Sequence, residues 1–187
     1  KKSQKVSTKV KIDPDNVLYK EAERLYSIKS YDEALKKINQ AIKINDKNSD
    51  YYYTRGKIKA GSLDFADAIS DYGTAIFIDE NRQDYYFARG SIWLIMDRLE
   101  EAKIDFEKCL EFDKYNPMFY DSLCMTLRDM GNFEEIISSV NNFFYYNKNK
   151  PSNKISLLSE EIVSLYNYRA NARNELNTEF NKALIDL

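Results

Sequence analysis

The chain contains no histidine, so it lacks the side chain that most often serves as a general base or a metal ligand. Its two cysteines are too few for a zinc site made of four protein ligands. No glycine-rich phosphate-binding loop is found among its five glycines. We therefore expect no metal, no cofactor and no enzymatic activity.

Long apolar runs are also missing. The longest spans residues 92–96, far below the roughly 18 residues that a membrane-spanning helix needs. A net charge of −2 gives no general attraction to nucleic acid. We expect neither membrane insertion nor nucleic-acid binding, and we expect a cytoplasmic protein.

Glycine and proline are scarce, at five and three residues in 187, as is typical of an all-helical chain. The polar residues 1–12 hold five lysines and are expected to form a flexible basic tail. The chain does not begin with Met, and we expect it to be part of a longer protein.

The middle of the chain contains two copies of one sequence repeat, in residues 51–80 and 85–114. The two copies align without a gap at an offset of 34 residues, which pairs Arg55 with Arg89, Gly56 with Gly90, Ala68 with Ala102 and Asp71 with Asp105. A fixed period of this length is typical of a helical solenoid.

Extending the period gives four repeats of 34 places each: 15–48, 49–82, 83–116 and 117–150. Each is predicted to form two helices, the first near 14–28, 50–62, 84–97 and 118–130 and the second near 32–45, 66–79, 100–113 and 134–146. Asp13-Pro14, Asn116-Pro117 and Pro151 then all stand at helix starts, where a proline is tolerated.

Three columns of the aligned repeats hold small residues in most repeats, and two hold bulky ones. Place 8 is Ala22, Gly56, Gly90 and Cys124, and place 20 is Ala34, Ala68, Ala102 and Ile136. We expect two helices to cross closely at the small places. The cysteines, Cys109 and Cys124, fall in such columns and are expected to be buried and reduced.

The period, the helical pairs and these columns resemble the tetratricopeptide repeat family. The resemblance implies an all-α, right-handed superhelical solenoid of antiparallel helix pairs, with about four and a half repeats in this chain. Residues 151–187 are expected to form a long helix, with Tyr168-Arg169-Ala170 matching the first helices of repeats two and three, and then the start of a truncated fifth repeat whose second helix begins near Phe180.

An apolar heptad stripe runs along this long helix from Ile155 to Leu176. It is longer than one repeat can cover. We expect it to pack back on repeat four near Phe143 and Phe144 in a monomer; a dimer through this helix is the alternative.

The resemblance also implies that the first helices line a concave face, with places 2, 5, 6, 9, 12 and 13 pointing into it. We expect a peptide or a segment of another protein to bind there. The predicted site residues are Tyr19, Lys20, Glu23, Asp50, Tyr53, Lys57, Asp84, Phe87, Ser91, Asp121, Met125 and Arg128.

Tyr19, Tyr53, Phe87 and Met125 are predicted to be apolar anchors for the ligand, and the acidic residues favour a basic and hydrophobic one. We expect Tyr53→Ala and Phe87→Ala to leave the fold intact. Co-chaperones of this family bind acidic C-terminal tails through Lys, Asn and Arg. The five places that carry those side chains hold Tyr19, Glu23, Thr54, Asp84 and Ala88 in this chain when counted from repeat one. Counted from repeat two, they hold Tyr53, Lys57, Ala88, Met118 and Ser122.

The function predicted from the sequence is a non-enzymatic scaffold for protein interactions. Two alternatives stay open. The repeats are the docking part of a larger enzyme, of the phosphatase or peptidyl-prolyl isomerase type, or they are a structural subunit of a complex.

Overall fold

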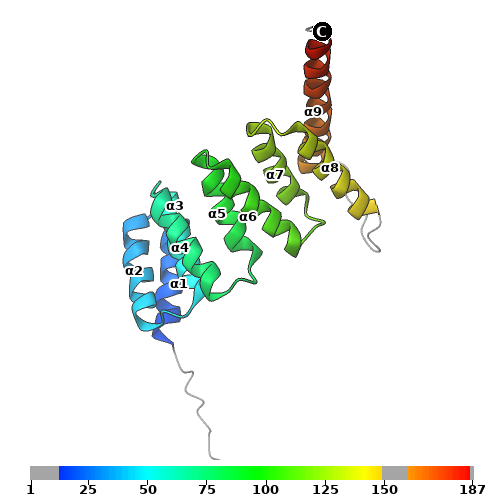
Figure 1. Cartoon of the computed structure of the whole chain (residues 1–187). Helices are drawn as coiled ribbons and strands as arrows, with labels where there is room; N and C mark the ends of the chain where they lie inside the picture. The colour runs from blue at the N-terminus through cyan, green and yellow to red at the C-terminus, as the bar shows by residue number, and fades with distance from the viewer. Residues whose placement is uncertain (1–12, 149–159, 186–187) are drawn as a thin grey trace, which may run out of the picture. The chain divides into compact units, whose positions relative to one another are not determined.

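Helices begin and end close to where the 34-residue period puts them (Figure 1). The computed structural model describes residues 13–148 and 160–185, and the expected basic tail and Pro151 lie outside this range. No strand occurs in the described residues. The helices are α1 (Pro14–Ser27), α2 (Tyr31–Ile44), α3 (Ser49–Gly61), α4 (Phe65–Ile78), α5 (Gln83–Ile95), α6 (Leu99–Phe112), α7 (Pro117–Asp129), α8 (Phe133–Lys148) and α9 (Glu160–Ile185).

The helix starts follow from capping chemistry. Asn48 and Asn116 each accept a hydrogen bond at 3.0 Å from the backbone N–H two residues on, which satisfies one donor at the start of α3 and α7. Pro14 and Pro117 are the first residues of α1 and α7, as predicted.

The turns inside the four repeats share one backbone conformation. Place 15 is left-handed in each, with φ of 60° at Lys29, 67° at Leu63, 58° at Asp97 and 72° at Gly131. The next residue donates its N–H to the carbonyl five residues back, as in Ser30 to Leu25 at 2.9 Å. This hydrogen bond closes a helix end. The period is therefore present in the backbone as well as in the sequence.

The described chain divides after Glu80 into two compact units. The first holds α1 to α4, with α1 against α2, α3 against α4, and α2 against α3. Its core consists of Ala22, Leu25, Ala34, Ile38, Ala41, Tyr51 and Ile58. The second holds α5 to α9, and its core gathers side chains from α6, α7, α8 and α9.

Within a repeat the two helices approach closely where the small residues stand. A Cβ added to Gly56 would lie 2.6 Å from the Tyr72 ring, and one added to Gly90 would lie 3.0 Å from the Phe106 ring and from the Cβ of Asp105. Ala22 and Cys124, at the same place, are fully buried. The predicted close crossings are confirmed at these positions.

A buried ion pair joins the same helices in repeats two and three. Arg55 donates to both carboxylate oxygens of Asp71 at 2.9 and 2.6 Å, and Arg89 donates to both oxygens of Asp105 at 2.8 Å. These hydrogen bonds raise the pKa of both arginines. The two aspartates are 3% and 1% exposed, so the arginines supply the charge that their burial requires.

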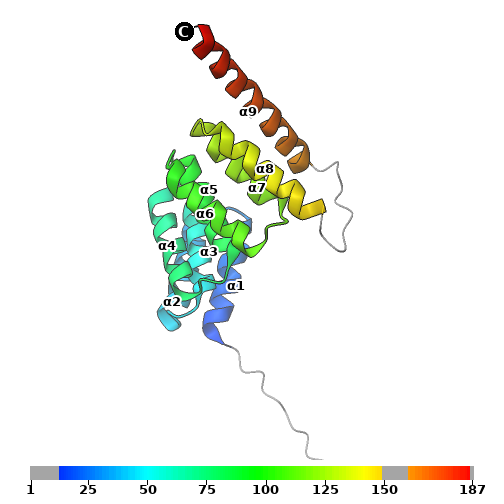
Figure 2. The same ribbon diagram turned by 45° about the vertical axis from the view of Figure 1, so that its right-hand side comes forward.

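The C-terminal helix differs from the sequence prediction in one respect. The turn expected before Phe180 is wrong, because α9 is continuous from Glu160 to Ile185 (Figure 2). Packing back on repeat four is confirmed: α9 lies against α7 and α8, Ile162, Leu165 and Ala172 are buried, and the Phe144 and Tyr166 rings lie 4.6 Å apart. Ile155, at the start of the predicted stripe, lies outside the described residues.

We predict that Gly56→Ala destabilises the protein, although alanine is the better helix former. The added methyl group would collide with Tyr72 at the crossing of α3 and α4, and such overpacking costs about 1–3 kcal/mol. Urea unfolding followed by circular dichroism measures the change. Ser70→Ala, at an exposed position of α4, is the control and should leave the midpoint the same or higher. An unchanged midpoint for Gly56→Ala would contradict the close crossing.

We predict that neither thiol reacts in the folded protein. Cys109 and Cys124 are free and buried, and burial raises the pKa of both thiols to about 12, so the reactive thiolate is scarce at neutral pH. A thiol reagent at pH 8 should label no cysteine in native protein and two in denaturant, counted by mass. Rapid labelling without denaturant would show that the α5–α8 region opens.

Candidate functional site

In the first unit, the predicted ligand-facing residues of α1 and α3 form one cluster. The Lys57 Nζ lies 4.8 Å from the centre of the Tyr53 ring and 5.7 Å from that of Tyr26, so a cation sits between two aromatic rings. Tyr53 also packs on Tyr72, with ring centres 5.8 Å apart. The cluster is thus partly a packing element of the repeat.

Tyr19 is half-buried beside Tyr51, with ring centres 5.1 Å apart. Burial raises its pKa to about 12, and a hydrogen bond with Glu23 adds to the shift. The hydroxyl is therefore neutral at physiological pH and can donate or accept a hydrogen bond. Lys20 is exposed on the same helix and Glu23 is half-buried.

An acidic cavity of about 380 Å³ lies at the start of α1 and α3. It is lined by Asp13, Asp15, Asn16, Tyr19, Asn45, Asn48, Asp50 and Tyr51. A hydrogen bond from Asn45 is the main cause that lowers the pKa of Asp15, and Tyr51 donates a second one at 3.0 Å. Among the described residues, three carboxylates and no cation line this cavity, so its lining favours a lysine or arginine side chain.

In the second unit, Phe87 on α5 is less free than predicted. Its ring lies 5.8 Å from Phe106 and 5.6 Å from Phe119, so it packs against both its own second helix and the next first helix. Phe87→Ala would remove contacts with two core rings, which favours a loss of stability, and the expectation that it leaves the fold intact stays an untested prediction. Asp84 is paired with Arg82 at 3.1 Å, and Ser91 donates its hydroxyl to the Phe87 carbonyl.

Asp121 on α7 is covered by α9. Its carboxyl group is hydrogen bonded with Ser164, and its Oδ1 atom is buried without a hydrogen-bond partner. Burial raises the pKa of this carboxyl, and the negative charge of Glu161 adds to the effect. Burial beneath α9 makes Asp121 less accessible than the sequence predicted, and its attraction for a basic ligand stays a prediction. Met125, one turn further along, is half-buried.

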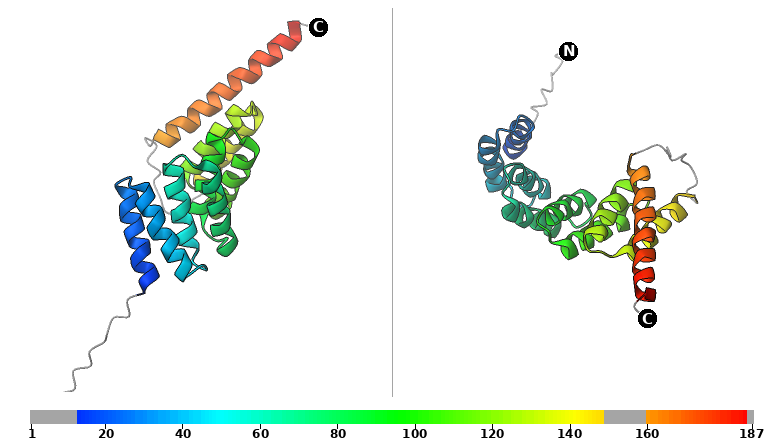
Figure 3. Two further views of the ribbon diagram at one scale, coloured as in Figure 1. Left: turned by 90° about the vertical axis from the view of Figure 1, so that its left-hand side faces the viewer. Right: turned by 90° about the horizontal axis from the view of Figure 1, so that it is seen from above.

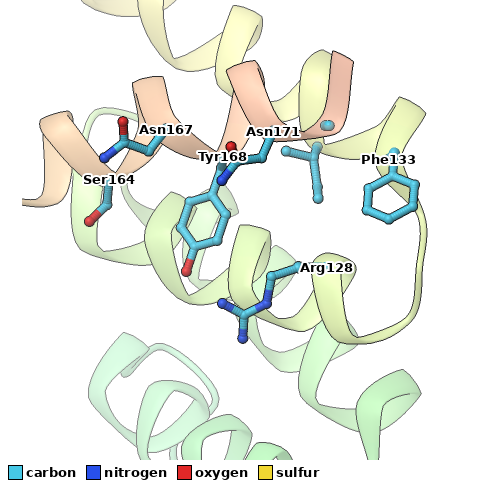
Figure 4. Close-up of a pocket in the computed structure, with 8 residues that line it drawn as sticks. Arg128, Phe133, Ser164, Asn167, Tyr168 and Asn171 are labelled. Atoms are coloured by element: carbon cyan, nitrogen blue, oxygen red, sulfur yellow. The ribbon is translucent and has the colours of Figure 1, made fainter. Parts of the chain in front are cut away.

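The residues at the contact of α7, α8 and α9 enclose a pocket of about 170 Å³, which we call the α7–α9 pocket. Figure 4 shows Ser164, Asn167, Tyr168 and Asn171 projecting from α9 beside Arg128 of α7. The full lining is Arg128, Phe133, Ile136, Ser164, Asn167, Tyr168, Asn171 and Ala172. The lining combines apolar side chains, of which Ile136 and Ala172 are buried, with amide and hydroxyl groups.

Seven of the eight lining residues were not among the predicted site residues, although for four of them the rule that finds them was available. Matching Arg169 to Arg55 puts Ser164, Asn167, Tyr168 and Asn171 at places 2, 5, 6 and 9 of a fifth first helix. The family resemblance implies that those places face the ligand, and Arg128 is place 12 of repeat four. Of the predicted residues, Arg128 is the one that lines the pocket.

The electrostatics of the α7–α9 pocket are close to neutral. Arg128 is paired with the adjacent Asp129 at 2.7 Å and lies 5.8 Å from the Tyr168 ring centre. Burial raises the pKa of Tyr168, so its hydroxyl stays protonated. A space of this size is smaller than the roughly 300 Å³ or more of sites for cofactors and drug-sized ligands. It suits one amino-acid side chain.

Among the described residues there is no group of three or more cysteine, aspartate or glutamate side chains that could hold a metal ion. In the same part of the chain, no helix is long and apolar enough to cross a membrane.

We predict that Asp121→Asn stabilises the protein at pH 7 by about 1 kcal/mol, because it removes a buried charge with an unpartnered oxygen. A carboxyl whose pKa is raised by folding weakens the folded state once it is ionised. The gain in the free energy of unfolding should therefore be complete at a pH above the raised pKa of Asp121, and it should disappear below pH 3.8, the ordinary pKa of this carboxyl. Urea unfolding at pH 7 and pH 3 measures it. Asp129→Asn, at an exposed position of the same helix, should show no such gain.

Neither a protein-family model nor a curated protein matches the sequence. Solved structures do match. The first tetratricopeptide domain of Spaghetti (RPAP3), bound to the HSP90 peptide SRMEEVD, has a TM-score of 0.61 at 23% identity, over 65% of this chain and 98% of that one. The Arabidopsis OM64 domain has a TM-score of 0.59 at 24% identity, over 62% and 95%. MamA reaches 0.67 at 16% identity, over 91% and 90%. With the period, the turns and the helix pairs described above, these likenesses show that the chain has the fold of a tetratricopeptide helical-repeat protein.

Proposed function

We propose that this chain is a non-enzymatic interaction scaffold that binds a segment of another protein. The observation that carries the proposal is the α7–α9 pocket, which has the size of one side chain and lies at ligand-facing places of two successive first helices. Concave apolar sites with a few polar groups are where proteins usually bind ligands. The peptide-bound RPAP3 domain supports this use of the fold.

The lining suggests how a segment would be held. Its apolar side chain would enter between Phe133, Ile136 and Ala172. The amides of Asn167 and Asn171, which are exposed on α9, can each donate to a backbone carbonyl and accept from a backbone N–H. The neutral hydroxyl of Tyr168 offers a further hydrogen bond. Such contacts recognise an extended backbone without requiring a charged ligand.

In the first unit, the acidic cavity around Asp13, Asp15 and Asp50 favours a lysine or arginine in the ligand. A ligand segment that binds the first unit is therefore proposed to be basic, and one that binds the second unit to be hydrophobic. Attraction to exposed carboxylates is screened by salt, so affinity should fall as ionic strength rises. An acidic tail like the one bound by RPAP3 would meet Glu23 and Asp50 instead of cations.

The two alternatives are a docking part of a larger enzyme and a structural subunit of a complex, and they differ from this proposal in what else is joined to or assembled with the repeats. A docking role in a larger enzyme uses the same pocket. A purely structural role needs no exchangeable ligand, and the exposed amides around the pocket argue against it. The cytoplasmic location stays a prediction.

Selection from a random peptide library displayed on phage tests the proposal. We expect enriched peptides to share one large apolar residue, which would enter the α7–α9 pocket. Asn171→Trp, which would fill the pocket from an exposed position, should weaken these peptides by at least about tenfold, since a central pocket residue dominates binding.

Asn174→Trp is the matched control, because Asn174 is exposed on the same helix but does not line the pocket. It should bind the peptides like the unchanged protein. If the peptides bind Asn171→Trp as tightly as the unchanged protein, they do not bind in the α7–α9 pocket. If no peptide is enriched, the scaffold proposal is contradicted.

A further inference from the structure

The first part of α9 has the register of a fifth first helix, and its contacts agree. Arg169 donates its Nη1 to Asn141 at 3.0 Å, and Arg55 donates its Nη1 to Asn39 at 3.0 Å; both asparagines stand at place 25 of the preceding repeat. The Arg169 guanidinium lies 5.4 Å from the Tyr166 ring centre, and that of Arg55 lies 5.3 Å from the ring centre of the tyrosine three residues before it. Arg169 is therefore the counterpart of Arg55.

One face of α9 lacks the cover that this register calls for. In repeats one to four the first helix packs on the helix that follows it, whereas α9 contacts α7 and α8 and no other helix of the described residues. The left view of Figure 3 shows both along one side of α9. Val163 is 49% exposed, Tyr166 is 45% exposed, and Ala170 and Arg173 are exposed as well. Their spacing of three, four and three residues puts these four on one side of the helix, which we call the open face.

In repeat two, two cations of the first helix pair with carboxylates of the second. Arg55 donates its Nε and Nη2 to Asp71 at 2.9 and 2.6 Å. Lys59, one turn further along α3, pairs with Asp67 at 3.1 Å and with Asp71 at 3.0 Å. The two aspartates are four residues apart, so they lie on one face of α4.

The same two places of α9 hold Arg169 and Arg173. Within residues 13–148 and 160–185, no carboxylate forms an ion pair with either arginine, and the Nε and Nη2 of Arg169 have no hydrogen-bond partner there. A helix that brings two carboxylates would therefore complete the arrangement seen in repeat two.

The two longer segments outside the described ranges do not bring this charge. Residues 1–12 and 149–159 contain no aspartate and no glutamate. Helix α9 itself continues to Ile185, which lies about 24 Å along the axis from Arg169. The carboxylates that match the open face have to come from elsewhere.

Ala170 sets the size of the apolar residue that fits beside these charges. In repeat two the same place is Gly56, and a Cβ there would lie 2.6 Å from the ring of Tyr72 at place 24. In repeat one the same place is Ala22, the residue at place 24 is Ile38, and both are fully buried in the core of the first unit. Glycine thus goes with an aromatic ring and alanine with an aliphatic side chain, so the open face calls for an aliphatic residue.

We propose that the open face binds an acidic amphipathic helix of another protein. Two carboxylates four residues apart pair with Arg173 and Arg169, and an aliphatic residue directly after the second carboxylate packs on Ala170. A small residue directly after the first carboxylate lets the two helices approach, as Ala68 does in repeat two, where its carbonyl oxygen would lie 3.2 Å from a Cβ on Gly56. The open face is separate from the α7–α9 pocket, so this proposal does not depend on the proposed function.

A peptide made from this chain's own α4 tests the docking. It has the sequence of residues 64–79 with Tyr72→Ile, and it carries a side-chain crosslink between positions 66 and 70, which are exposed in α4. The crosslink holds it helical, because isolated helices of this length are marginal in water. Fluorescence anisotropy of the labelled peptide with the 187-residue protein measures the affinity. We expect saturable binding that Arg173→Asp weakens at least about tenfold, since like charges then replace an ion pair.

Arg24→Asp is the matched control, because it removes an exposed cation of α1 and changes the net charge by the same amount. It should bind the peptide like the unchanged protein. Binding that Arg173→Asp leaves unchanged would place the peptide elsewhere, for example in repeat two in exchange for α4, and would overturn the proposal.

The fit at Ala170 distinguishes docking from a general attraction between charges. The peptide that keeps Tyr72 should bind the unchanged protein more weakly than the isoleucine peptide, and Ala170→Gly should reverse this order. Both Ala170 and Arg173 are exposed, so circular dichroism of the two variants should match the unchanged protein.

Three further results would overturn the proposal. The first is no binding of the isoleucine peptide, and the second is an order of the two peptides that Ala170→Gly leaves as it was. The third is a dimer of the unchanged protein in sedimentation equilibrium that Arg173→Asp dissociates, because the occupant would then be a second copy of this chain.

Discussion

The close approach of the two helices within a repeat is the constraint on which the rest of this structure depends. Glycine at place 8 lets Tyr72 and Phe106 lie directly on the first helix, and the same approach buries Asp71 and Asp105. A buried carboxylate is costly unless it is paired, so each crossing also needs its arginine. Close packing and ion pair are therefore one requirement, and a repeat that loses its second helix loses both.

Most of the architecture follows from the sequence because this constraint repeats. A small residue every 34 positions, with a bulky one four residues after place 20, fixes the helix pairs and their crossing. The urea prediction for Gly56→Ala tests that link directly. The roles of single surface residues were harder to predict. The angular position of Phe87 on α5 is readable from the sequence, but its contact with Phe119 of the next repeat is not.

Contacts between neighbouring repeats, which the sequence does not reveal, also decide which ligand-facing places form a pocket. Place 5 holds Tyr53 in repeat two and Asn167 in α9, and place 9 holds Lys57 and Asn171. Tyr53 and Lys57 have the longer side chains and contact each other, with the ammonium group of Lys57 over the Tyr53 ring. The shorter amides of α9 leave the space above Ile136 open. A ligand-facing place thus becomes a pocket only where its residues are too short to fill the junction.

The continuity of α9 distinguishes it from the first helices of repeats one to four. In repeats one to four, place 15 turns the chain with a left-handed residue, and Asn177 stands at that place in α9. Asparagine tolerates this conformation, yet here it continues the helix and keeps the backbone hydrogen bonds of α9. A hairpin would break several of these bonds, each worth about 1 kcal/mol. The continuous helix therefore keeps hydrogen bonds that a turn at Asn177 would lose.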